Sequence, residues 1–392
     1  MIRFTGIAST LRSRLAPRYL QKNLSTTQNG PSKVVMTWGS SSDGQLGRST
    51  NDFNFNYPGM VPLAGNPVKV SCGDLSTFAV IENGGDHRLF GWGRINDAPL
   101  RIPQEISSKF LKNRQVVDIA SGQSHSLLLL DDKKVYSFGN GLDGQLGRKS
   151  RDPSIAPVEG IEERVKSVSC GWNHSLALGE SGTLYVWGNS LYDQIGNGTF
   201  QHSASPVRVD NVDRPIVSMA GGVSHSVFLT NDDLIHVFGR DIMRGVQGHP
   251  GLKKLSMPEK KKPRKVISGL NHVLVFCQDG AIVSFGDNSE GQAGTDDVAT
   301  KTSPRVILEG CENVGTGPEH CLATRGDHLL CWGLGQDYQC LPERSIFNRP
   351  RRYELFEKMK IHQLCGGSSH STIIADATDE MMWKKLNNRG KY

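Results

Sequence analysis

The chain has 392 residues, with 45 Lys and Arg against 39 Asp and Glu, which gives a formal net charge of +6. Its longest purely apolar runs, such as residues 127–130, are far too short to span a bilayer. Eight cysteines are scattered without a C-x-x-C pair, which argues against a disulfide framework and a zinc site and favours a reducing compartment.

The first 32 residues predict a mitochondrial transit peptide. They contain five basic residues and no acidic one, and Ile7, Leu11 and Leu15 fall on one stripe of a helix. They lack the unbroken apolar core of a secretory signal. The alternative is a disordered basic tail. Residues 33–392 then carry 40 basic and 39 acidic residues, so the remaining chain is nearly neutral, which weakens the case for broad electrostatic binding to nucleic acid.

From residue 33 onward, one three-part phrase recurs about every 50 residues, seven times in all. It consists of a run ending in G-x-x-H, a strand ending in Trp-Gly or Phe-Gly, and a glycine turn such as D-G-Q-L-G at 43–47 and 143–147. The aromatic residues are Trp38, Trp92, Phe138, Trp187, Phe238, Phe285 and Trp332. The histidines are His125, His174, His225, His272, His320 and His370, and Ser76 takes the place of the histidine in the first unit. Short strands repeated at this spacing are typical of a β-propeller, here with seven blades.

The unit at residues 165–196 indicates what each part does. Residues 165–170 alternate in polarity, which predicts a strand, and Gly171 permits the tight reversal that follows. Further strands are predicted at residues 174–178, 183–187 and 206–209. Large aromatic side chains would fill the wedge between neighbouring blades. The recurrent histidine stands at a strand start, so we expect a structural role in which its ring bonds the backbone of the reversal and of the adjacent blade.

A ring of blades must close, because otherwise its first and last sheets leave exposed edges. The strand at residues 34–39 can complete the last blade, which contains residues 364–375. Residues 381–383 resemble a degenerate strand of the same kind, and the sequence leaves open which of the two segments lies outermost. We therefore predict a transit peptide at residues 1–32 and one propeller domain at residues 33–392.

The G-x-x-H-S, Y-x-W-G and G-Q-L-G phrases are similar to those of the regulator of chromosome condensation (RCC) repeat family, over roughly residues 33–376. The resemblance implies an all-β, seven-bladed β-propeller of RCC-type repeats. That family includes a nuclear exchange factor for the GTPase Ran, a plant ultraviolet receptor, ciliary scaffolds and mitochondrial members. A photoreceptor role is not expected, because Trp172 is the only tryptophan at its position among the seven units. The nuclear factor drives exchange with an inserted β-hairpin, and the even unit length leaves no comparable insertion here.

Departures from the repeat are the places where function is expected. Residues 94–99 and 242–248 replace the glycine turn in two units, and a basic run follows the second of them. The candidate partner-binding residues are Lys260, Lys261, Lys262, Arg264, Lys265, Arg349, Arg351 and Arg352. We expect both clusters in inter-strand loops, where they could bind phosphates or an acidic partner. The basic run also resembles a nuclear localisation signal, which conflicts with the N-terminus, and the alternative is a solvated loop.

The sequence predicts no catalytic residue, no cofactor site and no metal site. The recurrent histidines occupy one place in each unit, so they are spread around the ring instead of converging. Gly139, Gly141 and Gly144 match a dinucleotide fingerprint, but no helix is predicted after them. No nucleophile and base stand at a spacing that indicates covalent catalysis. Nucleotide exchange on a GTPase is the one enzyme activity left open.

The transit peptide and the repeats together resemble the mitochondrial members of the RCC family. That resemblance implies a protein-binding propeller in the matrix or on the matrix side of the inner membrane, where peripheral association with the membrane is compatible with its role. The first implied activity is guanine-nucleotide exchange on the dynamin-like GTPase of inner-membrane fusion. The alternative is non-enzymatic assembly of the large subunit of the mitochondrial ribosome, with a pseudouridine synthase and rRNA as partners.

Overall fold

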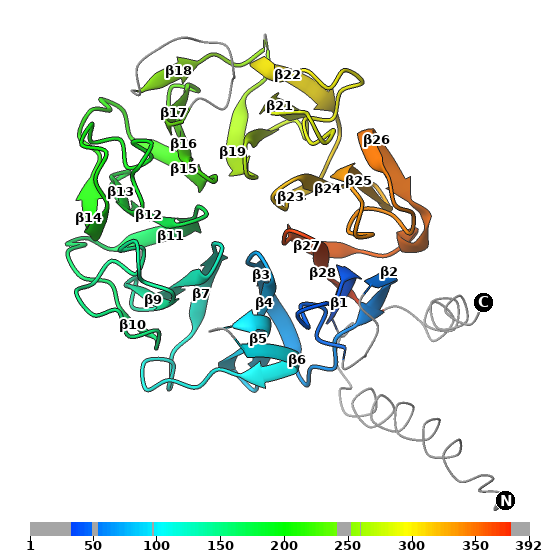
Figure 1. The fold of residues 1–392 in the computed structure, drawn as a ribbon, viewed down its shortest axis with the longest axis horizontal. Coiled ribbons are helices and arrows are strands. Elements are labelled where there is room, and N and C mark those ends of the chain that lie inside the picture. Colours follow the sequence, from blue (N-terminus) through cyan, green and yellow to red (C-terminus); the bar gives the residue numbers. More distant parts are fainter. Residues whose placement is uncertain (1–32, 49–53, 96–97, 241–251, 259, 378–392) are drawn as a thin grey trace, which may run out of the picture.

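The computed structural model describes residues 33–48, 54–95, 98–240, 252–258 and 260–377. In this part of the chain, 28 strands form seven four-stranded antiparallel sheets, which stand as blades around a common axis (Figure 1). The predicted all-β fold with seven propeller blades is therefore confirmed. We number the blades 1 to 7 in chain order from β3, so that blade 7 contains both ends of the described chain.

The innermost strand comes first in each of blades 1 to 6. Blade 1 contains β3 (Asn66–Cys72), β4 (Ser76–Asn83), β5 (Asp86–Ile95) and β6 (Ala98–Glu105). Blade 2 contains β7 (Val116–Ser121), β8 (His125–Leu130), β9 (Val135–Gly139) and β10 (Ala156–Pro157). Blade 3 contains β11 (Val165–Cys170), β12 (His174–Gly179), β13 (Leu184–Gly188) and β14 (Ser203–Arg208).

The next three blades repeat this order. Blade 4 contains β15 (Ile216–Gly221), β16 (His225–Thr230), β17 (Ile235–Gly239) and β18 (Lys253–Leu255). Blade 5 contains β19 (Pro263–Ser268), β20 (His272–Cys277), β21 (Ile282–Gly286) and β22 (Lys301–Leu308). Blade 6 contains β23 (Asn313–Thr316), β24 (His320–Arg325), β25 (His328–Leu334) and β26 (Ile346–Tyr353), followed by the 3₁₀ turn η1 (Glu354–Phe356).

Blade 7 closes the ring from two distant parts of the sequence (Figure 1). Its strand order is β2-β1-β28-β27, with bounds β1 (Lys33–Ser40), β2 (Asn54–Met60), β27 (Ile361–Gly366) and β28 (His370–Asp376). β1 pairs with β28 in register from Lys33 opposite Asp376 to Gly39 opposite His370. The predicted closure by residues 34–39 is confirmed, and β2 is the outermost strand. The other candidate segment, residues 381–383, and the predicted transit peptide lie outside the described residues.

The core lies between blades, where the two middle strands of each sheet are buried on both faces. All six residues of β8 and all five of β13 are buried. Trp38, Trp92, Trp187 and Trp332 have no exposed surface. Trp187 of blade 3 packs with Leu127 and Leu129 of blade 2, so the aromatic residues fill the wedge between blades as predicted.

The ring has two faces that differ in their connections. The face that carries the G-x-x-H reversals and the glycine turns, such as residues 143–147, is called the turn face. The opposite face carries the short connections between the second and third strands, such as residues 180–183, and is called the hairpin face. The turn face holds most of the repeated polar residues, so it is the face on which a site is sought first.

Candidate partner-binding face

Neighbouring blades are joined at the turn face by a recurring set of hydrogen bonds. Between blades 2 and 3, the Gln145 carbonyl oxygen accepts from Trp187 Nε1 at 2.9 Å and from Ser175 Oγ at 2.8 Å. His125 Nε2 lies 2.9 Å from the same Ser175 Oγ. Because the Ser175 hydroxyl gives its only proton to Gln145, His125 donates from Nε2, which fixes its tautomer. We call this set of bonds the junction network.

The recurrent histidines each bond across a junction between blades, one at each of six junctions. Each Nε2 lies 2.8–3.1 Å from a hydroxyl oxygen of the next blade, in the pairs His125–Ser175, His174–Ser226, His225–Ser268, His272–Thr316, His320–Ser371 and His370–Thr77. The expected contact with the adjacent blade is present, but its partner is a side-chain hydroxyl and not the backbone. Burial lowers the pKa of His125 to about 4 and that of His174, His225, His272 and His320 to about 3, so these rings are neutral at pH 7.

The junction between blades 1 and 2 lacks the histidine, the turn glutamine and the tryptophan of the junction network and keeps only its serine, Ser126. Ser76 replaces the histidine, and Phe138, which has no N–H group, replaces the tryptophan. In place of the glycine turn, β5 continues to Ile95 and turns almost directly into β6. The Ser126 hydroxyl, which has no turn carbonyl to reach, donates to Ser121 Oγ of its own blade at 3.1 Å.

The missing turn leaves a groove of about 550 Å³ on the turn face between blades 1 and 2. Apolar walls are formed by Phe78, Ile95, Phe138 and Leu142, and the guanidinium groups of Arg94 and Arg151 also line it. The Asp74 carboxyl lines both this groove and a smaller cavity, of about 110 Å³, on the propeller axis. Burial raises the pKa of Asp74 against the opposing effect of its hydrogen bond with Ser368.

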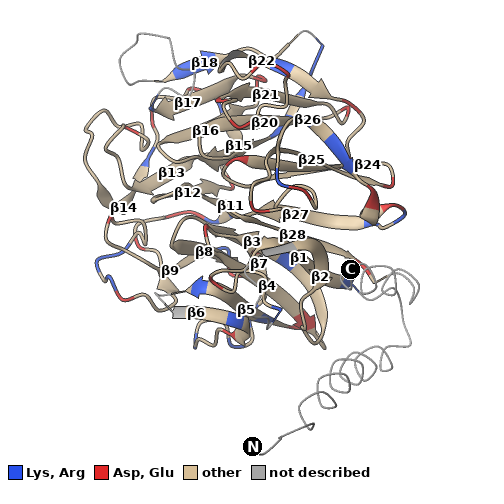
Figure 2. Ribbon diagram, turned by 45° about the vertical axis from the view of Figure 1, so that its right-hand side comes forward, with Lys and Arg blue, Asp and Glu red and all other residues tan. Residues whose placement is uncertain are grey.

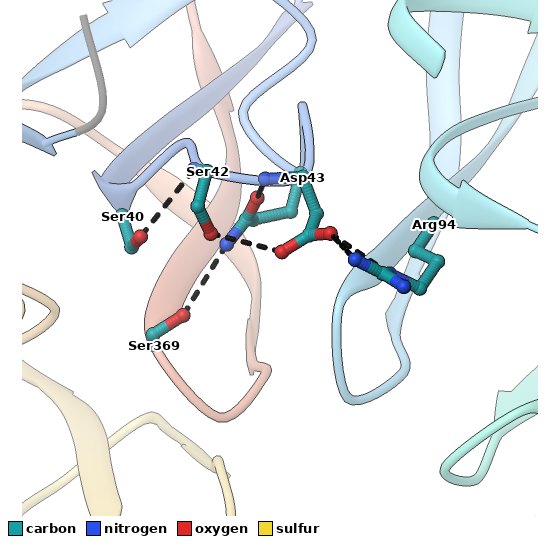
Figure 3. Close-up of polar contacts among 6 residues, drawn as sticks. Ser40, Ser42, Asp43, Arg94 and Ser369 are labelled. Carbon is teal, nitrogen blue, oxygen red and sulfur yellow. Dashed lines mark hydrogen bonds and ion pairs between the residues drawn. The ribbon is translucent and has the colours of Figure 1, made fainter. Parts of the chain in front are cut away.

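Arg94 is held at the rim of the groove by the turn of blade 7 (Figure 3). Its Nε donates to Asp43 Oδ1 at 2.8 Å, and Asp43 in turn accepts from Ser42 Oγ at 2.9 Å. The Asp43 amide donates to Gln45 Oε1 at 2.9 Å, and Gln45 Nε2 donates to Ser369 Oγ at 3.3 Å. The Asp43 side chain is only 12% exposed whereas that of Arg94 is 52% exposed, so the anchored arginine still presents donors to solvent.

The turns of blades 2 and 3 present apolar side chains to solvent. Leu142 in blade 2 is 69% exposed, and Leu191 and Tyr192 in blade 3 are 59% and 44% exposed. At the equivalent position, three residues before the turn glutamine, the other described turns carry Ser42, Ser289 and Gln336. One exposed leucine, Leu142, therefore lines the groove, and a second lies in the turn of the next blade, a combination that fits a protein partner.

The predicted basic residues do not form one patch of loops. Lys260, Lys261 and Lys262 lie in a loop before β19, at the hairpin face, as expected. Loop placement is wrong for the other five, because Arg264 and Lys265 lie in β19, and Arg349, Arg351 and Arg352 lie in β26. β26 is the outermost strand of its blade, where one edge meets solvent and charged side chains are tolerated, so a run that is rich in arginine can still pair as a strand.

Many of these side chains already have partners within the ring. Lys261 Nζ lies 2.8 Å from an Asp279 carboxylate oxygen and 2.7 Å from a Glu309 carboxylate oxygen. Arg349 pairs with Asp296 of the neighbouring blade. Figure 2 shows basic segments on β18 and β26 interspersed with acidic ones. Whether the eight residues bind a partner stays a prediction. The open groove is the stronger candidate for a binding surface, because its lining residues lie together.

Sequence reasoning singled out residues 94–99 but did not find the groove. The signal was present in the repeat itself, because the histidine, the turn glutamine and the tryptophan are lost together at a single junction. Taken separately, Phe138 and Ser76 resemble the ordinary variation of sequence between repeats. Leu142 could not be recognised as exposed without the turn geometry, since leucines in the same phrases, such as Leu146, are buried.

The described residues contain no group of three or more His, Cys, Asp or Glu side chains placed to hold a metal ion. Within the same residues, no helix is long and apolar enough to cross a membrane. The recurrent histidines face hydroxyl groups of the next blade, so no two of them share a site. What the face offers is shape, apolar contact and hydrogen bonding, which are means of binding a partner.

Comparison with known proteins agrees with this architecture. The model of the RCC1-like domain matches residues 23–259, more than half of the chain. The chain belongs to the RCC1-like domain family. Among its relatives, the ultraviolet-B receptor UVR8 of Arabidopsis thaliana is 29% identical over 330 residues, which cover 78% of this chain and 74% of the receptor. The regulator of chromosome condensation of Xenopus laevis is 36% identical over 127 residues, which cover 30% of this chain and 29% of that protein.

Solved structures show the same fold for this RCC1-like chain. Human WBSCR16 superposes with a TM-score of 0.79 at 19% identity, covering 89% of this chain and 100% of that one. Prp20p of Saccharomyces cerevisiae, whose structure was described with its binding to Gsp1p and histones, superposes with a TM-score of 0.77 at 18% identity, covering 93% of this chain and 96% of that one. At such identities the likeness shows the fold alone.

Proposed function

We propose that this RCC1-like propeller works in mitochondria as a protein-binding ring that promotes nucleotide exchange on a GTPase. The observation that carries the proposal is the groove between blades 1 and 2, where the turn and the tryptophan of the junction network are missing and the exposed Leu142 stands at the rim. A dynamin-like GTPase of inner-membrane fusion is the partner class suggested by the RCC resemblance. Family membership supports the protein-binding part, since the related Prp20p binds Gsp1p.

The groove suits the capture of a side chain from a folded partner. Interfaces draw most of their free energy from a few apolar or aromatic anchors in desolvated pockets, surrounded by a polar rim. Phe78, Phe138 and Ile95 provide such a pocket, and Arg94 and Arg151 provide rim donors. The closed ring holds these groups on paired strands, so little conformational entropy is lost when a partner docks.

An exchange factor acts by binding the nucleotide-free GTPase more tightly than the loaded one. The test is release of labelled GDP from the purified mitochondrial GTPase in the presence of the full chain. We expect faster release, and we expect Leu142→Asp to weaken binding at least tenfold, roughly 1.4 kcal/mol, by burying a charge in the pocket rim. Val298→Asp is the matched control, because Val298 is 61% exposed but does not line the groove.

The outcome also separates the two functions that the sequence suggests. An assembly factor for the ribosome would leave GDP release unchanged, and rRNA and large-subunit proteins would be recovered with the chain instead. The loss of that material in Leu142→Asp but not in Val298→Asp would assign the groove to ribosome assembly. Absence of both GTPase and ribosomal material from the purified complex would refute both functions.

The mitochondrial address rests on the composition of residues 1–32, which are basic, free of acidic residues and amphipathic. Removing them takes away no strand of the propeller, because the first described strand begins at Lys33. We therefore expect the truncated chain to fold and to stay outside mitochondria, as measured by fractionation and microscopy. Import of the truncated chain at the normal level would contradict the proposed address.

A further inference from the structure

Two cysteines face each other where the ring closes. Cys72 is the last residue of β3 in blade 1, and Cys365 lies near the end of β27 in blade 7. Both strands are the innermost of their blades, and they come from opposite ends of the sequence. The two Sγ atoms are 2.7 Å apart, which is closer than two non-bonded sulfur atoms pack. A disulfide bond of about 2.05 Å would need only a small further approach.

The surrounding backbone keeps the two strands at this distance. Gln363 of β27 donates from Nε2 to the Val70 carbonyl oxygen at 2.8 Å and accepts from the Val70 amide at 3.1 Å. The Ser368 amide donates to the Asp74 carbonyl oxygen at 3.0 Å. These bonds lie on both sides of the cysteines, so the thiols meet through fixed strands and not through a loop that must move.

Blade 3 provides an internal comparison. Cys170 occupies the same place before the reversal glycine as Cys72, and it lines the same axial cavity. Its Sγ reaches the neighbouring inner strand at the Ala120 carbonyl oxygen, 3.4 Å away. Ala120 stands where blade 7 has Cys365, so Cys170 has the position but no thiol to meet. The paired thiols are therefore a property of the closing junction and not of the repeat.

The Cys72 thiol borders a cavity and is activated. Each cysteine is only partly buried, and Cys72 lines the axial cavity of about 110 Å³, which is large enough for a small peroxide. Burial raises the pKa of Cys72, but hydrogen bonds from Cys365 and His370 lower it by more, to about 5. Burial raises the pKa of Cys365, which keeps its proton and donates it to Cys72. These shifts favour a thiolate at Cys72 beside a thiol at Cys365.

We propose that Cys72 and Cys365 form a reversible disulfide that closes the propeller covalently when a peroxide is present. The Cys72 thiolate attacks one oxygen of hydrogen peroxide, the O–O bond breaks, and the hydroxide released takes up a proton to form water. The resulting Cys72 sulfenic acid is attacked by the sulfur of Cys365, the S–O bond breaks, and a second water leaves with the Cys365 proton. Peroxide is reduced and two thiols are oxidised, and a dithiol reductant reverses the bond by exchange.

The bond would act where the fold is otherwise closed only by strand pairing. Blade 7 is held together by hydrogen bonds between β1 and β28, and these can separate when the chain unfolds. A link between residues 72 and 365 encloses nearly the whole propeller in one covalent loop, and long loops restrict the unfolded chain most. We therefore expect the oxidised protein to melt at a temperature several degrees above that of the reduced protein.

The experiment uses the full chain, treated with hydrogen peroxide under native conditions and alkylated before digestion with trypsin. We expect peptides 70–88 and 361–384 to appear joined with the loss of two hydrogens, and to separate after dithiothreitol. Peptide 167–208, which contains Cys170, should stay alkylated. If the first two peptides are recovered only in alkylated form, or if Cys170 is bridged as readily as Cys365, the proposal is overturned. This measurement on the unmodified chain does not depend on the folding of any variant.

Variants then connect the bond to the behaviour of the ring. Cys72→Ser and Cys365→Ser should each lose the rise in melting temperature on oxidation, and Cys170→Ser should keep it. Persistence of the rise in Cys365→Ser would show that another modification causes it and would overturn the proposal. Loss of the rise in Cys170→Ser would do the same, since that thiol has no partner across its junction.

Discussion

The junction between blades 2 and 3 and the junction between blades 1 and 2 are built from the same repeat but solve the problem of packing two blades differently. In the first, Gln145 receives hydrogen bonds from Trp187 and Ser175, and His125 supports the serine. In the second, the turn acceptor, the tryptophan and the histidine are absent, the serine hydroxyl bonds within its own blade, and Phe138 packs against Phe78 with ring centroids 5.3 Å apart. One junction is polar and covered by a turn, and the other is apolar and open.

The difference teaches that a tryptophan at this position depends on the turn carbonyl that accepts its N–H group. The four such tryptophans each donate to one, in the pairs Trp38–Gln339, Trp92–Gln45, Trp187–Gln145 and Trp332–Gln292. A buried donor without its acceptor costs about 1–3 kcal/mol, whereas replacing both partners by apolar groups is nearly neutral. Removing the turn while keeping the tryptophan would leave an indole N–H unpaired, so the phenylalanine at 138 accompanies the shortened connection. The shortened connection and the phenylalanine together expose the groove. A partner can therefore bind at the open junction.

Acid should distinguish the two kinds of junction most strongly, because only the polar ones contain histidine. Five of these histidines have a folded-state pKa of about 3 to 4, below the ordinary value of 6.5. Between these values the unfolded chain binds more protons than the folded chain, so stability falls as pH decreases from about 6.5 towards 4. From pH 6.5 to 5 each histidine should cost roughly 1.6 kcal/mol, which amounts to roughly 8 kcal/mol for five.

The measurement is denaturant unfolding as a function of pH. His174→Gln keeps a side-chain donor but cannot titrate, so it should reduce the proton uptake on unfolding by about one and flatten the pH dependence accordingly. His202→Gln, a substitution of an exposed histidine outside the junction networks, should leave the dependence of the unfolding free energy on pH unchanged. A wild-type stability that stays level between pH 6.5 and 5 would contradict neutral, buried histidines.

The closeness of the turn to the neighbouring tryptophan can be tested at Gly147. This glycine has a φ of +64°, and a Cβ atom there would lie 2.6 Å from Trp187 Nε1. Gly147→Ala should therefore destabilise the fold by roughly 2–5 kcal/mol, combining the left-handed backbone with overpacking. Gly198 has a similar φ of +70°, but a Cβ atom there would meet no other atom within 4 Å, so Gly198→Ala isolates the backbone cost of about 1–2 kcal/mol. Equal losses in thermal or chemical unfolding would show that the turn does not press on the tryptophan.

The polar junction should also be more sensitive to the loss of a single hydroxyl. Ser175→Ala leaves the His125 Nε2 donor unpaired in a buried site and should cost about 1–3 kcal/mol. Ser126→Ala, at the equivalent position of the open junction, removes only a bond to Ser121 and should cost less than about 1 kcal/mol. The two variants are compared by chemical denaturation at pH 7. A larger loss in Ser126→Ala would reverse the assignment of which junction depends on polar contacts.

The fold could be predicted from the sequence because its repeat is long, regular and local. Seven copies of the strand phrases fix the blade count, and the unpaired strand at residues 34–39 fixes the closure, since an open edge is unfavourable. Strand bounds in blade 3 agree with the prediction at β11, the next two strands differ by one residue, and β14 begins three residues earlier than predicted.

The site could not be predicted to the same degree, because it depends on what surrounds each residue. The basic run at 260–265 and the arginines at 349–352 stood out by charge, but charge alone does not reveal that Lys261 has two carboxylate partners or that Arg351 lies in a strand. The groove arises from substitutions that are far apart in the sequence, at residues 76, 94–99 and 138, and meet only at one junction. Its exposed leucine belongs to a phrase that is otherwise buried.

The smallest effect on stability is expected at Arg94, and this makes it the sharpest test of the open junction as a binding site. Arg94 pairs with Asp43 at the rim of the groove, but its side chain is 52% exposed, so water screens the pair. Arg94→Ala should change the free energy of unfolding by less than about 1 kcal/mol.

Arg148 is the matched comparison within a polar junction. It follows the turn of blade 2, is 5% exposed, and donates to the Ser137 carbonyl oxygen at 2.7 Å and the Ser154 carbonyl oxygen at 2.8 Å. Arg148→Ala should cost roughly 2–4 kcal/mol, because several buried charge-assisted bonds are lost. The two arginines thus have different roles. Arg148 holds the loop of blade 2 in place, whereas Arg94 is held in place by Asp43 in the turn of blade 7.

Partner binding should depend more on Arg94 than on Arg148, the reverse of their order for stability. If the groove receives a partner, Arg94→Glu slows association, and the effect is larger at low salt because screening weakens steering between exposed charges. Association rates with the mitochondrial GTPase, measured at two ionic strengths on a chain whose melting temperature is unchanged, give the answer. A loss of stability in Arg94→Glu comparable to that in Arg148→Ala would mean that Arg94 serves the fold, and an unchanged association rate would place the partner elsewhere on the ring.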